Sequence, residues 1–144
     1  MKILIYSPLF YPSIGGLETV VSILAHEFVS QGHEVKLVSQ TPDPEAKPFP
    51  FEVIRQPGFK HLLALTDWCE VYFQPNISLK GLYPLVAHPK PWVVSHNNWY
   101  SRTNGSLGWQ DRLKQGLLRW ATNISVSQAV ADHIAVPSTV IPNP

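Results

Sequence analysis

The sequence is short of the features that mark several protein classes. It has one cysteine, Cys69, in 144 residues, which excludes an intramolecular disulfide and a cysteine-based metal site and favours a reducing compartment. Charged residues make up only 15% of the chain, the net charge is +1, and no basic stripe of the kind that binds nucleic acid is visible. We therefore expect no nucleic-acid partner.

Long apolar runs and targeting signals are also missing. No run reaches the roughly 18 apolar residues of a transmembrane helix, and an apolar stretch follows Met1 and Lys2 directly, leaving no room for a signal peptide. The histidines other than His96 show no metal-ligand spacing, so the sequence predicts no metal site. Length and composition predict one cytoplasmic domain over residues 1–144.

Short apolar segments alternate with helical ones along the chain. Strands are expected at 2–7, 34–40, 51–55, 71–73, 92–94, 124–126 and 139–141. Helices are expected from Leu17 to the helix-ending Gly32, at 59–68, at 77–87 with a kink or early end at Pro84, at 108–121 with Leu113, Leu117 and Trp120 on one face, and at 128–134 with Ser127 as cap. This alternation predicts a Rossmann-like α/β fold, a parallel sheet of about six to seven strands with helices on both faces.

Gly15 and Gly16 lie between the first expected strand and the first expected helix. A helix N-terminus carries unpaired N–H groups and partial positive charge, and glycines would let an anion approach them. The pair is therefore a candidate phosphate-binding site, although a tight turn in which the glycines supply positive φ explains it equally well. The loop is not GxGxxG and has no Lys-Ser/Thr, so a P-loop enzyme is disfavoured. A dinucleotide-dependent oxidoreductase is disfavoured too, because no acidic residue ends the second strand.

Four loops follow expected strands, at 8–16, 74–76, 95–100 and 127. Parallel strands would place all four at the carboxyl edge of the sheet, where ligands bind in α/β folds. His96 is the best candidate for a catalytic side chain, because it is expected just after a strand and should point into the edge crevice. A hydrogen bond within its own loop is the simpler explanation. Further candidates on the acceptor side are Tyr11, Ser13, Asn97, Asn98 and Arg102.

Four stretches carry a resemblance to a known family. SPLFYPSIGGLETVVSILAHEFVSQGHEVKLVS at 7–39, VVSHNN at 93–98, ISVSQAVADHI at 124–134 and TVIPNP at 139–144 resemble family-4 glycosyltransferases of the GT-B fold. The resemblance implies the N-terminal, acceptor-side half of a retaining, metal-independent enzyme. Such an enzyme moves a sugar from a nucleotide-sugar, its co-substrate, to a sugar, lipid or small-molecule acceptor without a further cofactor. It implies that Gly15 and Gly16 face the donor diphosphate and that His96 lies near the transferred sugar.

The family continues after TVIPNP into a second, donor-binding domain that the 144 residues do not include. We therefore expect a partner domain or partner chain, and no transferase activity from this chain alone. In relatives with lipid acceptors a basic helix lies near the membrane. The helix expected at 108–121 carries only three basic residues, Arg112, Lys114 and Arg119, which favours a solvated face over a membrane-binding one. Peripheral membrane contact through the acceptor stays an open alternative. The alternative is a non-enzymatic Rossmann-like module that binds a phosphate or sugar or docks a partner.

Overall fold

The computed structural model describes residues 1–99 and 108–144. The strands form one parallel sheet in the order β3-β2-β1-β4-β5-β6-β7. They are β1 (Lys2–Tyr6), β2 (Glu34–Ser39), β3 (Glu52–Arg55), β4 (Val71–Pro75), β5 (Trp92–His96), β6 (Thr122–Ser125) and β7 (Thr139–Val140). The predicted fold class, a Rossmann-like parallel sheet between helices, is confirmed.

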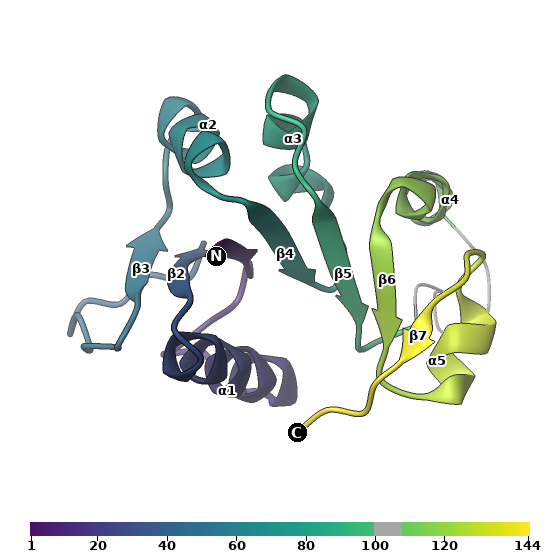
Figure 1. The fold of residues 1–144 in the computed structure, drawn as a ribbon, viewed down its shortest axis with the longest axis horizontal. Coiled ribbons are helices and arrows are strands. Elements are labelled where there is room, and N and C mark those ends of the chain that lie inside the picture. Colours follow the sequence, from purple (N-terminus) through teal and green to yellow (C-terminus); the bar gives the residue numbers. More distant parts are fainter. Residues whose placement is uncertain (100–107) are drawn as a thin grey trace.

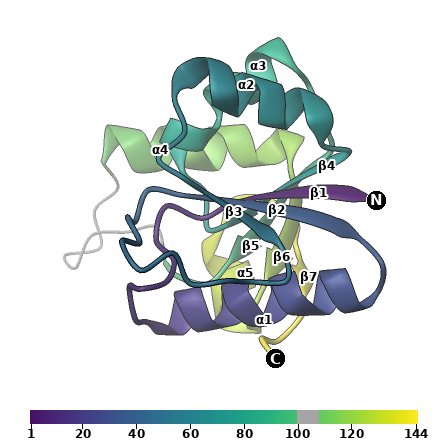
Figure 2. The same cartoon turned by 90° about the vertical axis from the view of Figure 1, so that its left-hand side faces the viewer.

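Helices cover both faces of the sheet. They are α1 (Gly16–Ser30), α2 (Phe59–Trp68), α3 (Tyr83–Ala87), α4 (Trp109–Leu117) and α5 (Gln128–His133), with 3₁₀ turns at Leu79–Gly81 and Leu118–Trp120. Figures 1 and 2 show α2, α3 and α4 on one face and α1 and α5 on the other. Within the described part of the chain, no helix has the length and apolarity needed to cross a membrane.

The direction in which strands are added reverses at β1. The next strand along the chain, β2, pairs with one side of β1, whereas β4 pairs with the other side. A parallel α/β sheet has its topological switch point at such a reversal, and ligands bind beyond the carboxyl ends of the strands there. The loop that leaves β1 and carries the two glycines therefore starts at this point.

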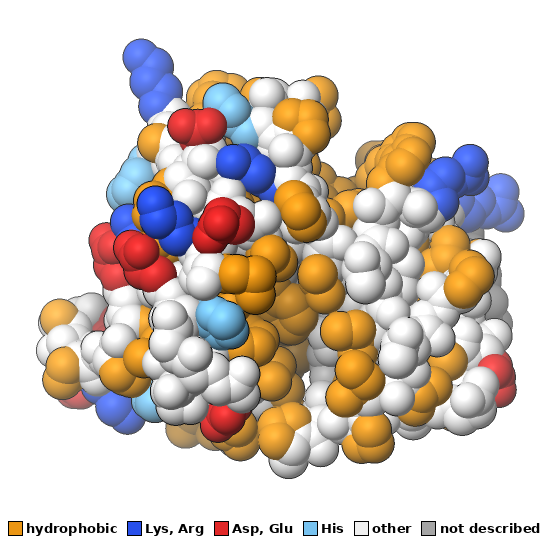
Figure 3. Space-filling view, in the orientation of Figure 1, with side chains coloured by type: hydrophobic (Ala, Val, Ile, Leu, Met, Phe, Trp, Pro, Cys, Tyr) orange, Lys and Arg blue, Asp and Glu red, His pale blue; other side chains and the backbone are white. Residues whose placement is uncertain are grey.

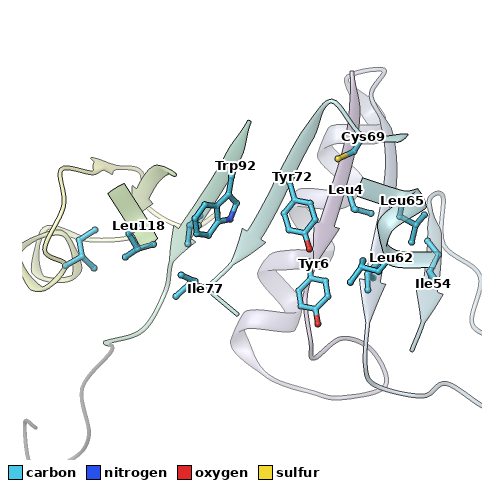
Figure 4. Packing of buried hydrophobic residues seen from close by; sticks show 13 residues of the cluster. Leu4, Tyr6, Ile54, Leu62, Leu65, Cys69, Tyr72, Ile77, Trp92 and Leu118 are labelled. Carbon is cyan, nitrogen blue, oxygen red and sulfur yellow. The ribbon is translucent and has the colours of Figure 1, made fainter. Parts of the chain in front are cut away.

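The core has two parts, one on each side of the sheet. Successive side chains of a strand point to opposite faces, and in β1 the residues Ile3 and Ile5 join the cluster under α1 while Leu4 and Tyr6 join the cluster under α2, α3 and α4. Figure 4 shows part of the second cluster. Burial on both faces explains why β1 is a continuous apolar run rather than an alternating one.

Two predicted helix ends are confirmed. Gly32 has φ 85°, a left-handed conformation that glycine adopts without strain, and it follows the last residues of α1. The Ser127 side chain accepts a hydrogen bond from the Val130 N–H at 3.3 Å, which caps α5.

Two predicted strand ends are wrong, because both strands run further than expected. Gln74 and Pro75 belong to β4, where Pro75 pairs with Ser95. Pro75 is the last residue of β4, where its missing N–H removes at most one hydrogen bond of the ladder. Ser95 and His96 belong to β5 and pair with β6, so they are not loop residues.

Two predicted helices are shorter than expected. The segment 77–87 divides into a 3₁₀ turn and α3, in which Pro84 lies near the helix start where its missing N–H costs little. The segment 108–121 changes from α-helix to 3₁₀ turn after Leu117. This change turns Leu118 into the core, whereas Leu113 and Trp120, expected on the buried face, are 45% and 71% exposed.

Candidate functional site

The loops after β1, β4 and β5 meet at the carboxyl edge of the sheet, and hydrogen bonds connect two of them. The Asn97 N–H, after β5, donates to Asn76 Oδ1, after β4, at 2.7 Å. Asn143 Nδ2, near the end of the chain, donates to Asn97 Oδ1 at 3.0 Å. Asn97 thus lies at a junction of three segments that are far apart in the sequence, and its position is fixed by both neighbours.

The glycine pair is not explained by backbone strain. Gly15 has φ −174° and ψ 170°, an extended conformation open to any residue, and Gly16 is the first residue of α1 with no positive φ. The interpretation of the pair as a turn that needs positive φ is therefore wrong. A side-chain carbon added at Gly16 would have no neighbour within 4 Å, so packing does not require glycine there either.

A carboxylate lies against one of the two glycines. A side-chain carbon at Gly15 would collide with the carboxylate of Glu18. Ser13 Oγ donates a hydrogen bond to Glu18 Oε1 at 2.9 Å and holds the carboxylate in this place. An anion near Gly15 would thus meet a negative charge, whereas the approach to Gly16 is open.

Two of the predicted acceptor-side residues share a groove with the segment of Gly15 and Gly16, which we call the glycine turn. Tyr11 and Ser13 line a groove of about 270 Å³ together with Gly15 and Glu18. Lys47, from the loop between β2 and β3, also lines the groove, and its Nζ lies 4.5 Å from the centroid of the Tyr11 ring. Lys47 was missed by sequence reasoning, because its Pro-rich loop has no periodicity that places it beside the glycines.

Arg55 is a second residue that the sequence did not single out. It ends β3, and its Nη1 donates to the backbone carbonyls of Tyr11 and Thr41, while Nη2 lies 3.6 Å from Asp43 Oδ2. Burial lowers the pKa of Arg55, and the charge of Asp43 partly offsets this. The guanidinium connects the loops after β1 and β2 to the end of β3. It therefore fixes the position of the backbone at Tyr11, which lines the groove.

His96 does not point into an open crevice, and that expectation is wrong. Its side chain is 0% exposed, and Nε2 lies 2.9 Å from Asn123 Oδ1. Because a carbonyl oxygen can only accept, Nε2 carries the proton. Burial lowers the pKa of His96, which favours the neutral ring, and the hydrogen bond to Asn123 partly offsets this.

Asn123 connects His96 to the neighbouring helix layer. Its Nδ2 donates to the carbonyl oxygens of Leu118 and Ala121 at 2.9 and 3.0 Å. His96 is therefore part of a buried network at the ends of β5 and η2 (Leu118–Trp120). The catalytic role of His96 stays a prediction, and this network fits a role in orientation better than one in proton transfer.

The remaining predicted residues extend away from β5. Asn98 is exposed, and Trp99, 60% exposed, stacks on the His133 ring of α5 with 4.7 Å between centroids. Arg102 lies outside the described residues. Over residues 1–99 and 108–144, no three His, Cys, Asp or Glu side chains are grouped in a way that could hold a metal ion.

The arrangement of strands and helices is similar to that of solved glycosyltransferases. One is an α-glucosyltransferase in complex with UDP and a 13-mer DNA containing a HMU base, at 18% identity and a TM-score of 0.60, with 99% of this chain and 41% of that chain covered. Another is AviGT4, a glycosyltransferase involved in avilamycin A biosynthesis, at 19% identity and a TM-score of 0.58, with 99% and 42% covered. This chain has a glycosyltransferase-like Rossmann fold.

An epimerase has a similar fold, with less of this chain matched. UDP-glucose 4-epimerase with UDP-glucose from the hyperthermophile Thermotoga maritima is 9% identical at a TM-score of 0.55, with 87% of this chain and 54% of that chain covered. No protein-family model and no curated protein sequence matches this chain. The chain spans about two fifths of the length of the glycosyltransferases that it matches.

Proposed function

We propose that this chain is the N-terminal, acceptor-side domain of a GT-B glycosyltransferase of family-4 type, retaining and metal-independent. In that enzyme a sugar passes from a nucleotide-sugar to a sugar, lipid or small-molecule acceptor. The observation that supports the proposal most is the glycine turn at the switch point of the sheet. Gly16 is required neither by backbone conformation nor by packing, so the approach of a ligand is the remaining reason for a bare backbone there.

In this proposal the domain orients the substrates and stabilises the negative charge that develops on the leaving diphosphate. The amides at the start of α1 would donate to the diphosphate as it leaves, where negative charge develops. Tyr11 and Ser13 would contact the acceptor from the groove beside the turn, and Asn97 and Asn98 would contact the sugar or acceptor from the loop after β5. His96 would act through the buried network that sets the end of β5. Donor recognition would come from a second domain or chain.

An assay of the purified chain tests the need for that partner. Incubated with a panel of nucleotide-sugars and candidate acceptors, the 144-residue chain is expected to release no nucleoside diphosphate above the rate of spontaneous hydrolysis. The reason is that donor recognition and the cationic diphosphate contacts are assigned to the second domain. Clear sugar transfer by the chain alone would contradict this division of labour.

Gly16→Ala separates a ligand-binding role from a structural one. We expect the free energy of unfolding to stay constant or to rise by up to about 1 kcal/mol, because alanine favours a helix more than glycine does. Binding of inorganic pyrophosphate or UDP, measured by the shifts of amide resonances on titration, is expected to weaken by about tenfold, because the new methyl group lies where the anion approaches.

Gly32→Ala is the matched control. The positive φ of Gly32 makes alanine unfavourable, so this variant is expected to lose about 1 kcal/mol of stability. It lies at the far end of α1 from the glycine turn, so its affinity for the same anions should equal that of the wild type. Equal binding by Gly16→Ala and the wild type would remove the main support for the proposed donor contact.

The alternative function is a non-enzymatic module that binds a phosphate or sugar by itself. The observation in its favour is that the described residues form a continuous seven-stranded sheet with cores on both faces. Calorimetry with a nucleoside diphosphate distinguishes the two functions. The transferase domain is expected to bind in the millimolar range, since most nucleotide contacts belong to the partner, whereas micromolar binding or tighter favours the module.

A further inference from the structure

A crevice of about 330 Å³ lies at the carboxyl edge of the sheet, on the face that α4 covers. It is lined by Pro8, from the loop after β1, by Ile77, from the loop after β4, and by residues of α4. The order of the sheet reverses between β1 and β4. Ligands of parallel α/β sheets bind beyond the strand ends at this point, so we call the hollow the switch-point crevice.

Polar side chains distinguish the switch-point crevice from the hollow between α3 and α4. That hollow is lined mainly by apolar side chains, which border it in Figure 3, and it offers little to select one ligand over another. The polar residues that line the switch-point crevice are Ser78, Lys80, Gln110 and Lys114. They supply a hydroxyl, an amide and two ammonium groups, and no acidic side chain of the described residues lines the crevice.

The two lysines have no carboxylate partner. Within the part of the chain that the structure describes, the ion pairs involve other cations, and neither Lys80 nor Lys114 takes part in one. Lys80 is exposed, whereas Lys114 is half-buried. Asp111 lies three residues before Lys114 in α4, but its Oδ2 accepts a hydrogen bond from the Gly108 N–H at 3.1 Å. The protein therefore leaves both positive charges of the crevice for an anion.

A buried side chain holds the turn that carries Lys80. Gln74 is 0% exposed, its Nε2 donates to the Ser78 carbonyl at 3.2 Å, and its Oε1 accepts from the Ser78 N–H at 3.4 Å. The carbonyl of Gly81, the last residue of the turn, accepts from Tyr72 Oη at 2.6 Å. The backbone is thus fixed on both sides of Lys80, which lowers the cost of ordering this segment when a ligand binds.

We propose that the switch-point crevice binds a phosphorylated sugar. A phosphate monoester carries a charge of about −1.5 to −2 at neutral pH, and its oxygens accept hydrogen bonds from Lys80 and Lys114. The sugar hydroxyls form hydrogen bonds with Ser78 and Gln110. The volume lies at the lower end of the range of about 300–1,000 Å³ that is usual for small-molecule sites. This site is separate from the glycine turn and does not depend on the proposed transferase function.

Isothermal titration of the full chain with glucose 6-phosphate tests the proposal. We expect saturable binding of one molecule per chain. Glucose, which lacks the phosphate, is expected to bind at least about tenfold more weakly, and inorganic phosphate, which lacks the sugar, several times more weakly. Equal affinities for glucose and glucose 6-phosphate would overturn the proposal. So would equal affinities for inorganic phosphate and glucose 6-phosphate, because the sugar would then contribute nothing.

Lys80→Met and Lys114→Met locate the site. Each variant keeps an apolar stem and removes one charge, so each is expected to weaken the binding of glucose 6-phosphate by about tenfold. Lys2→Met removes a charge at the start of β1, at the opposite edge of the sheet, and should leave binding unchanged. Unchanged binding by both variants in the crevice, or an equal loss in Lys2→Met, would overturn the proposal. A loss in Gly16→Ala alone would assign the phosphate to the glycine turn and overturn it too.

Discussion

Gly81→Ala is expected to lower the free energy of unfolding by about 1–3 kcal/mol, the usual cost of forcing extra volume into a packed core. Gly81 is buried at the end of a 3₁₀ turn, and a side-chain carbon there would lie 2.6 Å from the Tyr6 ring and 2.8 Å from Gln74 Nε2. The Gly81 carbonyl also accepts a hydrogen bond from Tyr72 Oη at 2.6 Å. The buried Tyr6 ring and the Gln74 amide, which donates a hydrogen bond to the Ser78 carbonyl at 3.2 Å, would both have to move.

Gly116→Ala is the control for this prediction. Gly116 lies inside α4, and a side-chain carbon there would meet nothing within 4 Å. Alanine is better than glycine in a helix, so this variant is expected to gain about 0.5–1 kcal/mol. Urea unfolding followed by far-UV circular dichroism measures both changes. Equal stabilities of the two variants would show that the contact between the 3₁₀ turn and β1 is looser than described.

His96→Ala is expected to cost about 2–5 kcal/mol, because it opens a cavity and leaves a buried amide oxygen without its donor. The amide is that of Asn123, which His96 contacts at 2.9 Å. His61→Ala is the control: His61 is exposed on α2, and its replacement should change stability by no more than about 0.5 kcal/mol. A His96→Ala variant as stable as the His61 variant would contradict the buried network.

The pH dependence of the free energy of unfolding tests the burial of His96 in a second way, through protonation of its ring. Burial lowers the pKa of His96 below its ordinary value of 6.5 in the folded protein, whereas the unfolded chain keeps the ordinary value. Below that pH the unfolded state binds more protons, so stability falls as the pH drops from 6.5 toward the folded pKa. His96→Gln, measured by urea unfolding at a series of pH values, should lose less stability than the wild type over this window. An unchanged slope would assign the pH dependence to other groups.

Local patterns were sufficient to predict the fold of this chain. The apolar run of β1, the glycine turn, the amphipathic α1 and the helix-ending Gly32 follow one another in a β-loop-α-β order that allows few arrangements. The shared edge of the loops after β1 and β5 followed from parallel strands alone. The seven-stranded parallel sheet confirms this part of the prediction.

The environment of individual side chains could not be predicted in the same way. His96 is buried because β5 runs two residues past its apolar part to pair with β6, and its partner Asn123 lies 27 residues further along the chain. Arg55 contacts Tyr11 across 44 residues, and the sequence holds no periodic signal for such a pair. Leu118, rather than the expected Trp120, lies in the core because the chain winds as a 3₁₀ turn after Leu117. The spacing of apolar residues in the sequence does not reveal this change of winding.

Amide resonances recorded during a titration with UDP-glucose test the central claim most directly. The claim is that the backbone at the start of α1 and the loop after β5 belong to one rim that meets a nucleotide-sugar. The account predicts weak binding in which the resonances of Gly15, Gly16 and Asn97 shift most, with the shifts reduced in Gly16→Ala. Shifts confined to residues outside this rim, or shifts at Gly15 and Gly16 that Gly16→Ala leaves unchanged, would contradict it.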